Sequence, residues 1–449
     1  MRETAGKECE KQLLKTAKNG YSSSVEGIYL PRVLDQNLAD RLDNFPALLI
    51  SGPRAAGKTT SAMRLAASML RLDTPAVAEV VRADPDAALR RMEEPLLLDE
   101  WQEVPTVLGA VKRAVDADPR PGRFLLTGSV EADLAAATWP GTGRVVRSVM
   151  YPLACREIDG AGDGGGLLPI LLAGSLDDVR VPPGAPDVDE YVDLALRGGF
   201  PEPVFRLSER LSREWYDGYV DQIVTRDAKL VAGRRPALLR QYLEVLALST
   251  AGLPADTTLF EGAGINKDTA RGYDDLLQSL FVYEPVRAWL SNRLNRLLKR
   301  PKRYVLDVGV AAAAGRFDAT AILGDADLLG RTLDTFVAAQ IRPELVTVPG
   351  APRLHHLRAE GGRRESDLVL DAGNGRIVGI EVKASSAPTS RDARHLAWLR
   401  DQLGDRFVRG VVFHTGPLPF ELDERIWALP ICAFWARSAD GFRVTNRLR

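Results

Sequence analysis

The segment GPRAAGKT, residues 52–59, constrains the fold more than any other part of the chain. It directly follows the short apolar run at 47–50 and satisfies G-x-x-x-x-G-K-[ST] between a predicted strand and a predicted helix. Its two glycines let backbone N–H groups turn inward around phosphates, and the helix adds the positive end of its dipole. The pattern predicts a nucleotide site made by Gly52, Pro53, Arg54, Ala55, Ala56, Gly57, Lys58, Thr59 and Thr60.

A pair of acids after the next apolar run completes this predicted site. The run LLLDE ends in Asp99 and Glu100, forty residues after Thr59. In such a site Lys58 meets the β- and γ-phosphates, while Thr59 and Asp99 hold Mg²⁺ and Glu100 polarises the attacking water. A DE pair alone is often only a strand end that meets solvent. With the phosphate loop upstream, it predicts ATP and Mg²⁺ as cofactors.

A third apolar run, in RFLLTGS, places Thr127 and Ser129 at the carboxyl end of a predicted strand. Open α/β sheets present ligand-contacting residues at this end. Either hydroxyl is therefore a candidate contact of the γ-phosphate. The alternative is a turn that simply requires small polar residues.

The length of 449 residues predicts about three domains. We expect a flexible tail at 1–28, a first α/β domain at 29–187 that ends in a Gly/Pro-rich loop from Ile158, a helical region at 188–303, and a second α/β domain at 304–449. Three scattered cysteines, no apolar run long enough to span a bilayer and no secretion signal predict a cytoplasmic protein without membrane contact, structural zinc or disulfides.

The helical region contains the pattern of a winged helix. PALLRQYLEVLALSTAG and INKDTARGYDDLLQSLFVYEPVRAW predict helix, helix and hairpin, with Asn266 or Asp268 starting the second helix and the wing starting at 283–288. A basic run follows, so residues 266–303 are a candidate surface for DNA or RNA. Its cations are Arg293, Arg296, Lys299, Arg300, Lys302 and Arg303. The acids of the second helix would repel phosphates, so packing against a protein is the alternative.

The segment RRESDLVLDAGNGRIVGIEVKASS predicts two strands joined by a turn at Asn374-Gly375. Residues i and i+2 of a strand share a face, so Glu381 and Lys383 are expected to point together toward Asp367. Two carboxylates can bind Mg²⁺ and a lysine beside them can orient water, with Asp334 as a possible further ligand. The alternative is an ion pair on a half-exposed sheet. RYVLDVG, VRGVVF and ICAFW are further predicted strands.

Several runs together resemble a widespread prokaryotic AAA-type ATPase family whose members carry a C-terminal domain of unknown function. They are YLPRVLDQNLADRLDNFPALLISGPRAAGKTT, LLLDEWQEVP, RFLLTGS, GTGRVVRSVMYPLACREI, GGFPEP, YDGYVDQIVTRD and RPKRYVLDVGVAA. The resemblance covers nearly the whole chain after the tail. It implies a P-loop AAA-like parallel sheet domain, then a helical and winged-helix region, then an α/β domain similar to the PD-(D/E)xK nuclease fold.

The same resemblance draws attention to Arg144 and Arg147, with Arg226 as a weaker third candidate. An arginine at these places could reach a γ-phosphate in its own subunit or in a neighbour, which would require a homo-oligomer. Solvated charges at a strand edge are the alternative. Relatives often differ at Ala55 and Ala56, but the loop needs only small residues there.

Three hypotheses of function remain open at this stage. The first is a Mg²⁺-dependent ATPase associated with nucleic acid. The second is an ATP-dependent nuclease in defence or repair, and the third is a nucleotide-dependent switch or scaffold for a protein partner.

Overall fold

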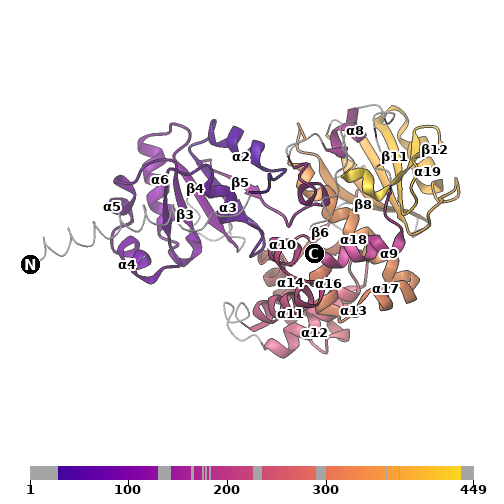
Figure 1. Ribbon diagram of the computed structural model, residues 1–449, viewed down its shortest axis with the longest axis horizontal. Helices are drawn as coiled ribbons and strands as arrows, with labels where there is room; N and C mark the ends of the chain where they lie inside the picture. The colour runs from indigo at the N-terminus through magenta and orange to yellow at the C-terminus, as the bar shows by residue number, and fades with distance from the viewer. Residues whose placement is uncertain are drawn as a thin grey trace, which may run out of the picture. The chain divides into compact units, whose positions relative to one another are not determined.

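The computed structural model describes residues 29–129, 143–162, 166–173, 176, 179, 181, 184–225, 235–289, 300–346, 348–359, 362–373 and 375–435. By spatial contact the chain forms two compact units, one of Met1–Tyr151 with Ser279–Phe281 and one of Pro152–Gln278 with Val282–Arg449 (Figure 1). The boundaries expected after residues 28, 187 and 303 stay predictions. The predicted tail, Arg226, Asn374 and the cations at 293, 296 and 299 lie outside the described residues.

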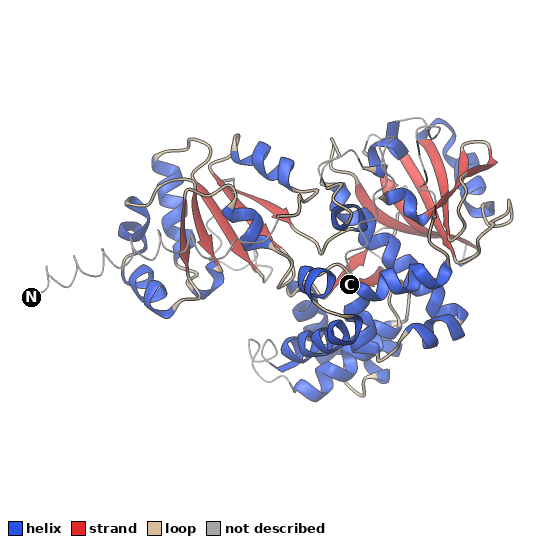
Figure 2. Ribbon diagram, in the orientation of Figure 1, coloured by secondary structure: helices blue, strands red, loops and turns tan. Residues whose placement is uncertain are grey.

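The first unit is built on a parallel sheet of five strands, as the apolar runs predicted (Figure 2). Its strands, in the spatial order β2-β3-β4-β1-β5, are β1 (Ala47–Ser51), β2 (Ser68–Arg71), β3 (Leu96–Asp99), β4 (Phe124–Gly128) and β5 (Val145–Val149). The three inner strands are buried along their whole length, which is why each reads as a continuous apolar run. The outer strands β2 and β5 are short and partly polar, and the sequence did not reveal them.

Helices supply the apolar side chains that cover this sheet. They are α2 (Asp35–Leu42), α3 (Lys58–Met63), α4 (Pro75–Ala83), α5 (Pro85–Arg90), the 3-10 helix η1 (Trp101–Glu103) and α6 (Val107–Ala117). Alternate strand residues such as Leu49, Leu98 and Leu126 pack in one cluster with side chains of α4, α5 and α6. Helices α2 and α3 contact β1, whose intervening residues lie on the other face.

The second unit begins with helices that the sequence predicted only in part. They are α7 (Cys155–Ile158), α8 (Leu167–Ala173), α9 (Val188–Arg197), α10 (Pro201–Arg206), α11 (Glu209–Thr225), α12 (Pro236–Leu248), α13 (Asp256–Gly262) and α14 (Lys267–Ser279). The segment from Ile158, expected to be a loop or an insertion, contains the helix α8, which buries Leu168 and Leu171 in the core of this unit. The glycines and prolines on either side of α8 are typical of loops, so this short apolar helix was not predicted.

The predicted hairpin follows α14. Strands β6 (Tyr283–Val286) and β7 (Lys302–Val305) pair antiparallel, with Tyr283 opposite Val305 and Val286 opposite Lys302. Asn266 accepts a hydrogen bond from the backbone N–H of Thr269 at 2.8 Å, which places this residue at the start of α14. One helix more than predicted, α13, precedes α14.

The rest of the second unit contains a mixed six-stranded sheet with the order β12-β13-β11-β10-β9-β8. Its elements are α16 (Val308–Gly315), α17 (Ala319–Gly324), α18 (Ala326–Leu345), β8 (Arg353–Ala359), β9 (Arg364–Asp371), β10 (Ile377–Lys383), α19 (Arg394–Leu403), η5 (Gly404–Arg406), β11 (Phe407–His414), β12 (Phe420–Asp423), β13 (Ile426–Pro430) and η6 (Ile431–Phe434). Leu368 and Ile380 pack with α18, whereas Val369 packs with α19, so the sheet is covered on both faces (Figure 2).

The strand predicted from ICAFW is wrong, because these residues form the 3-10 helix η6 directly after β13. Pro430 ends β13 and has no N–H with which to extend the ladder. The apolar character of ICAFW reflects burial in the core and not an extended backbone.

A buried carboxylate joins distant helices of the second unit. Asp307 accepts hydrogen bonds from the backbone N–H of Val310 at 3.2 Å, which caps α16, and from that of Gly199 at 2.7 Å. Burial raises the pKa of Asp307 to about 6, although the backbone donors oppose that shift. A Cβ at Gly198 would lie 2.5 Å from this carboxylate, so the close approach of the two segments requires glycine there.

We expect Asp307→Ala to destabilise the region around α16 by about 2–4 kcal/mol, because two buried N–H groups lose their acceptor. Asp318→Ala is the matched control, since Asp318 caps α17 from an exposed position and its loss should cost only about 1 kcal/mol. Native-state hydrogen exchange of the α16 amides at several urea concentrations measures the difference. Equal losses in the two variants would contradict a linking role for Asp307.

Candidate functional site

The loop between β1 and α3 has the backbone of a phosphate-binding loop. Gly52 has a φ of 151°, and a Cβ there would lie 2.1 Å from the carbonyl oxygen of Met150. Gly57 has a φ of 94° and precedes the first residue of α3. Both predicted glycines therefore occupy positions that other residues would strain.

Lys58 lies folded over this loop. Its side chain is 5% exposed, and its ammonium donates to the carbonyl oxygens of Gly52 at 3.0 Å and Pro53 at 2.7 Å. Burial lowers the pKa of Lys58 to about 8, while the charges of Glu100 and Asp99 act in the opposite direction. A phosphate that enters the loop would offer this cation an anionic partner in place of two neutral carbonyl groups.

Asp99 is the point at which the predicted residues meet. A single oxygen, Oδ1, accepts hydrogen bonds from the hydroxyls of Thr59 at 2.7 Å and Thr127 at 2.5 Å. Asp99 and Thr127 are register partners in β3 and β4, and Thr59 belongs to the first turn of α3. Adjacent hydroxyl and carboxylate oxygens suit Mg²⁺, which prefers oxygen ligands, so these residues fit the implied ion.

Glu100 follows directly and leaves the sheet. Its backbone is left-handed, with φ 55° and ψ 50°, and it precedes η1. Its carboxylate accepts a hydrogen bond from the side-chain amide of Gln102. Glu100 is partly exposed, in contrast to the buried Asp99, so its carboxylate can meet water.

The remaining candidates differ in their distance from the loop. Ser129 is buried, with its hydroxyl 3.4 Å from Nε of Arg54. Arg147 donates from Nε to the hydroxyl of Ser51 at 2.8 Å, immediately before the loop. Arg144 forms an ion pair with Asp116 of α6 at 2.8 Å. Of the two arginines, Arg147 is therefore the one beside the loop within this chain.

Sequence reasoning missed Arg32, which makes hydrogen bonds that support the phosphate-binding loop. This buried guanidinium donates to the carbonyl oxygens of Ala56 and Tyr151, each at 2.8 Å. Next to it, the hydroxyl of Tyr29 lies 2.8 Å from that of Ser61 in α3. The only available signal was an isolated cation in the run YLPRVL, which does not reveal its partners.

We expect Arg32→Ala to weaken nucleotide affinity about tenfold, because a lost charged hydrogen bond is worth about 1.5–3 kcal/mol and leaves the loop less ordered. Arg64→Ala is the control: Arg64 is exposed, and its guanidinium lies 4.0 Å from the centre of the Tyr29 ring. Titration with a fluorescent ATP analogue measures both. Unchanged affinity in Arg32→Ala would show that the loop needs no such support.

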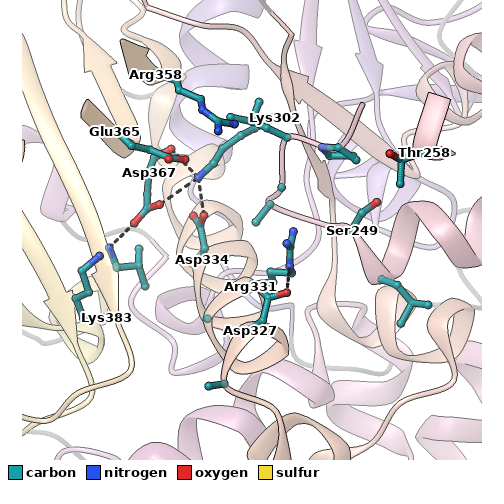
Figure 3. Close-up of a pocket in the computed structure, with 18 residues that line it drawn as sticks. Ser249, Thr258, Lys302, Asp327, Arg331, Asp334, Arg358, Glu365, Asp367 and Lys383 are labelled. Atoms are coloured by element: carbon teal, nitrogen blue, oxygen red, sulfur yellow. Dashed lines mark hydrogen bonds and ion pairs between the residues drawn. The ribbon is translucent and has the colours of Figure 1, made fainter. Parts of the chain in front are cut away.

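A second group of charged residues lines a cavity of about 610 Å³ in the second unit. Figure 3 shows the ammonium of Lys302 between the carboxylates of Asp334 and Asp367, at 2.9 and 3.2 Å. They come from β7, α18 and β9 respectively. The carboxylates of Asp334 and Asp367 raise the pKa of Lys302 well above its ordinary value, although burial alone would lower it.

The predicted residues Glu381 and Lys383 also lie here. Their side chains meet at 2.8 Å, and Asp367 accepts a hydrogen bond from the backbone N–H of Val382 between them at 3.0 Å. Burial and the nearby charge of Asp367 raise the pKa of Glu381 to about 8. The structure therefore brings Asp367, Glu381 and Lys383 together, as expected from the strand pattern, and places Asp334 of α18 beside them.

The expectation that residues 266–303 form a basic surface is wrong for its last two cations, Lys302 and Arg303. Lys302 is 3% exposed and Arg303 is 7% exposed. Arg303 forms ion pairs with Asp256 at 3.0 Å and Asp274 at 3.5 Å. These two cations are paired inside the unit and cannot contact phosphates of a nucleic acid.

Three separate stretches of the chain match known protein families. Residues 44–159 match the AAA domain family. Residues 188–321 and 329–434 match two domains of unknown function, DUF8612 and DUF4143. Residues 44–159 are thus similar to AAA domains, and no activity is attached to the other two matches.

Two mycobacterial proteins are similar over most of the chain. The uncharacterized proteins Mb2031c of Mycobacterium bovis and Rv2008c of Mycobacterium tuberculosis are each 27% identical over 394 residues, which is 87% of this chain and 81% of theirs. Among solved structures, the Walker-type ATPase PABY2304 of Pyrococcus abyssi is similar with 12% identity and a TM-score of 0.41, covering 65% of this chain and 99% of that one. No helix among the described residues is long and apolar enough to cross a membrane.

Proposed function

We propose that this protein is a Mg²⁺-dependent ATP hydrolase of the AAA type. The observation that carries the proposal is the hydrogen bonding of Thr59 and Thr127 to one oxygen of Asp99, beside the buried Lys58. This arrangement joins a cation for phosphates and oxygen donors for a metal at the carboxyl edge of a parallel sheet. A cytoplasmic location, where ATP is available, is part of the proposal.

The chain's own residues divide the work of hydrolysis. Mg²⁺, when bound, neutralises phosphate charge. The loop 52–57 and Lys58 bind the phosphates, Thr59 and Asp99 hold the ion, and Glu100 orients and polarises the attacking water. Thr127 or Ser129 contacts the γ-phosphate. Arg147 can act within the chain, whereas Arg144 is the candidate for reaching a neighbouring subunit in a homo-oligomer.

We expect Lys58→Ala to abolish detectable ATP binding, because the loop loses its only ammonium. Glu100→Gln should bind ATP normally and lose at least about a hundredfold in turnover, since an amide cannot accept the proton of water. Fluorescent-nucleotide titration and phosphate release measure the two properties.

The matched control for the second variant is Glu103→Gln, because Glu103 is an exposed acid at the end of η1, the short helix that Glu100 precedes. It should retain full turnover. Normal phosphate release by Glu100→Gln would refute the assignment of the catalytic base.

A second proposal concerns association with nucleic acid. Three helices followed by the antiparallel pair β6–β7 have the element order of a winged helix. The residues 287–301 that connect these strands include no acid. They carry five cations, namely Arg287, Arg293, Arg296, Lys299 and Arg300. This charge supports contact with phosphates, whereas the exposed residues of α14, Lys267, Asp268, Arg271 and Asp275, balance one another.

We expect the full chain to bind duplex or single-stranded DNA with an affinity that falls steeply between 50 and 200 mM salt, as phosphate contacts require. Replacing Arg293, Arg296 and Lys299 by Glu should remove this binding, whereas Lys267→Glu on α14 should change it little. Fluorescence anisotropy of labelled DNA at both salt concentrations measures this binding. Binding that is absent or independent of salt would favour the switch or scaffold with a protein partner.

Cleavage of nucleic acid is not part of the proposal. It would need a metal ion between carboxylates that accept hydrogen bonds from the chain itself. Among the residues that the structure describes, no three His, Cys, Asp or Glu side chains are grouped to hold a metal ion. Metal-dependent cleavage by the residues at 367, 381 and 383 stays a prediction.

A further inference from the structure

Lys302 enters the acid cluster from outside the six-stranded sheet. It is the first residue of β7, the strand that completes the hairpin of the helical region. Its ammonium reaches Oδ2 of Asp334 at 2.9 Å and both Oδ1 and the carbonyl oxygen of Asp367 at 3.2 Å (Figure 3). Three segments distant in sequence therefore meet at one nitrogen atom.

The carboxylate of Asp334 has partners on both of its oxygens. Oδ2 accepts from Lys302, and the hydroxyl of Tyr304 lies 3.0 Å from Oδ1 and 3.2 Å from Oδ2. Tyr304 and Lys302 are two residues apart on β7, so they share a face of this strand. β7 thus presents a cation and a hydroxyl to the same buried acid.

The carboxylate of Asp367 is occupied in the same way. Oδ1 accepts from Lys302 and Oδ2 accepts from the backbone N–H of Val382. Glu381, next along β10, is bound by Lys383 through Oε2. The oxygens of Asp334 and Asp367 are therefore used by groups of the protein, whereas Oε1 of Glu381 is buried without a hydrogen-bond partner among the described residues.

The position of Lys302 is fixed from both sides. Its neighbour Arg303 points to the other face of β7 and pairs with Asp256 and Asp274. Farther along the strand, the backbone N–H of Val305 donates to the hydroxyl of Thr250 at 3.1 Å. These contacts hold the backbone of β7 in the register that brings Lys302 to the carboxylates.

We propose that Lys302 is the resident cation of this carboxylate site, where its ammonium takes the place of a divalent metal between Asp334 and Asp367. A dication in the same position would be repelled by the ammonium of Lys302, because like charges at such short range disfavour each other. The site therefore fastens the hairpin to the sheet domain and binds no catalytic metal while β7 is in place. This inference does not depend on hydrolysis of ATP.

The test counts Mn²⁺ ions bound to the nucleotide-free full chain by electron paramagnetic resonance, which detects free Mn²⁺. We expect wild type and Asp367→Asn to bind the same number. Lys302→Ala should bind one further ion per chain, at least tenfold more tightly than Lys302→Ala/Asp367→Asn. Mn²⁺ bound near the phosphate loop is common to all variants and cancels in these differences.

The matched control is Arg303→Ala, which removes the neighbouring buried cation of the same strand and should create no site that depends on Asp367. A Mn²⁺ ion bound by wild type and lost in Asp367→Asn would overturn the proposal. So would a folded Lys302→Ala variant that gains no ion, or Mn²⁺-dependent cleavage of DNA or RNA by wild type that Asp367→Ala abolishes.

A second measurement applies if Lys302→Ala does not fold. Lys302→Met leaves two buried carboxylates without their cation and should lower the urea concentration at the midpoint of unfolding. Adding Asp334→Asn should raise the equilibrium constant for folding at least tenfold above that of Lys302→Met. If the added change brings no recovery, Lys302 does not compensate Asp334 and the proposal fails. Loss of ATP turnover in any variant would bear on the proposed hydrolysis and not on this site.

Discussion

A carboxylate that is taken out of water must be paired or hydrogen-bonded, and the first unit is organised around one such group, Asp99, which is 2% exposed. Its hydrogen bonds come from the first turn of α3 and from the neighbouring strand β4. Asp99 therefore links the start of α3 to the carboxyl ends of β3 and β4. Folding of the sheet thus brings Asp99, Thr59 and Thr127 together within the chain itself.

The second unit follows the same rule with a different result. Asp307 is satisfied by backbone N–H groups and joins two helical segments, whereas Asp334 and Asp367 are satisfied by a lysine ammonium. The layout of acids around β9 and β10 matches the pattern of a metal site, yet the charge is already balanced by the chain. A similar arrangement of carboxylates can thus serve as an attachment in one context and as a metal site in another, and the neighbouring cation decides between them.

The elements with strong local patterns could be predicted from the sequence. The inner strands β1, β3 and β4 are continuous apolar runs, and the glycines of the phosphate loop have a recognised spacing. The partners of Arg32 and Lys302 could not be predicted, because they lie far away along the chain. Those of Arg32 are 24 and 119 residues away. Those of Lys302 are 32 and 65 residues away. A cation in a basic run has no local feature that distinguishes a buried ion pair from a solvated charge. Helix α8 was missed for the related reason that its burial depends on a sheet formed about two hundred residues later.

The alternation of Lys302 and Arg303 on β7 has a consequence for how this region can vary. Side chains of a strand change sides at every residue, so the two cations serve acids on opposite faces only in one alignment. An insertion or deletion of a single residue inside β7 would exchange them and place each buried acid opposite the wrong side chain. Length changes inside the strand itself should therefore be rare.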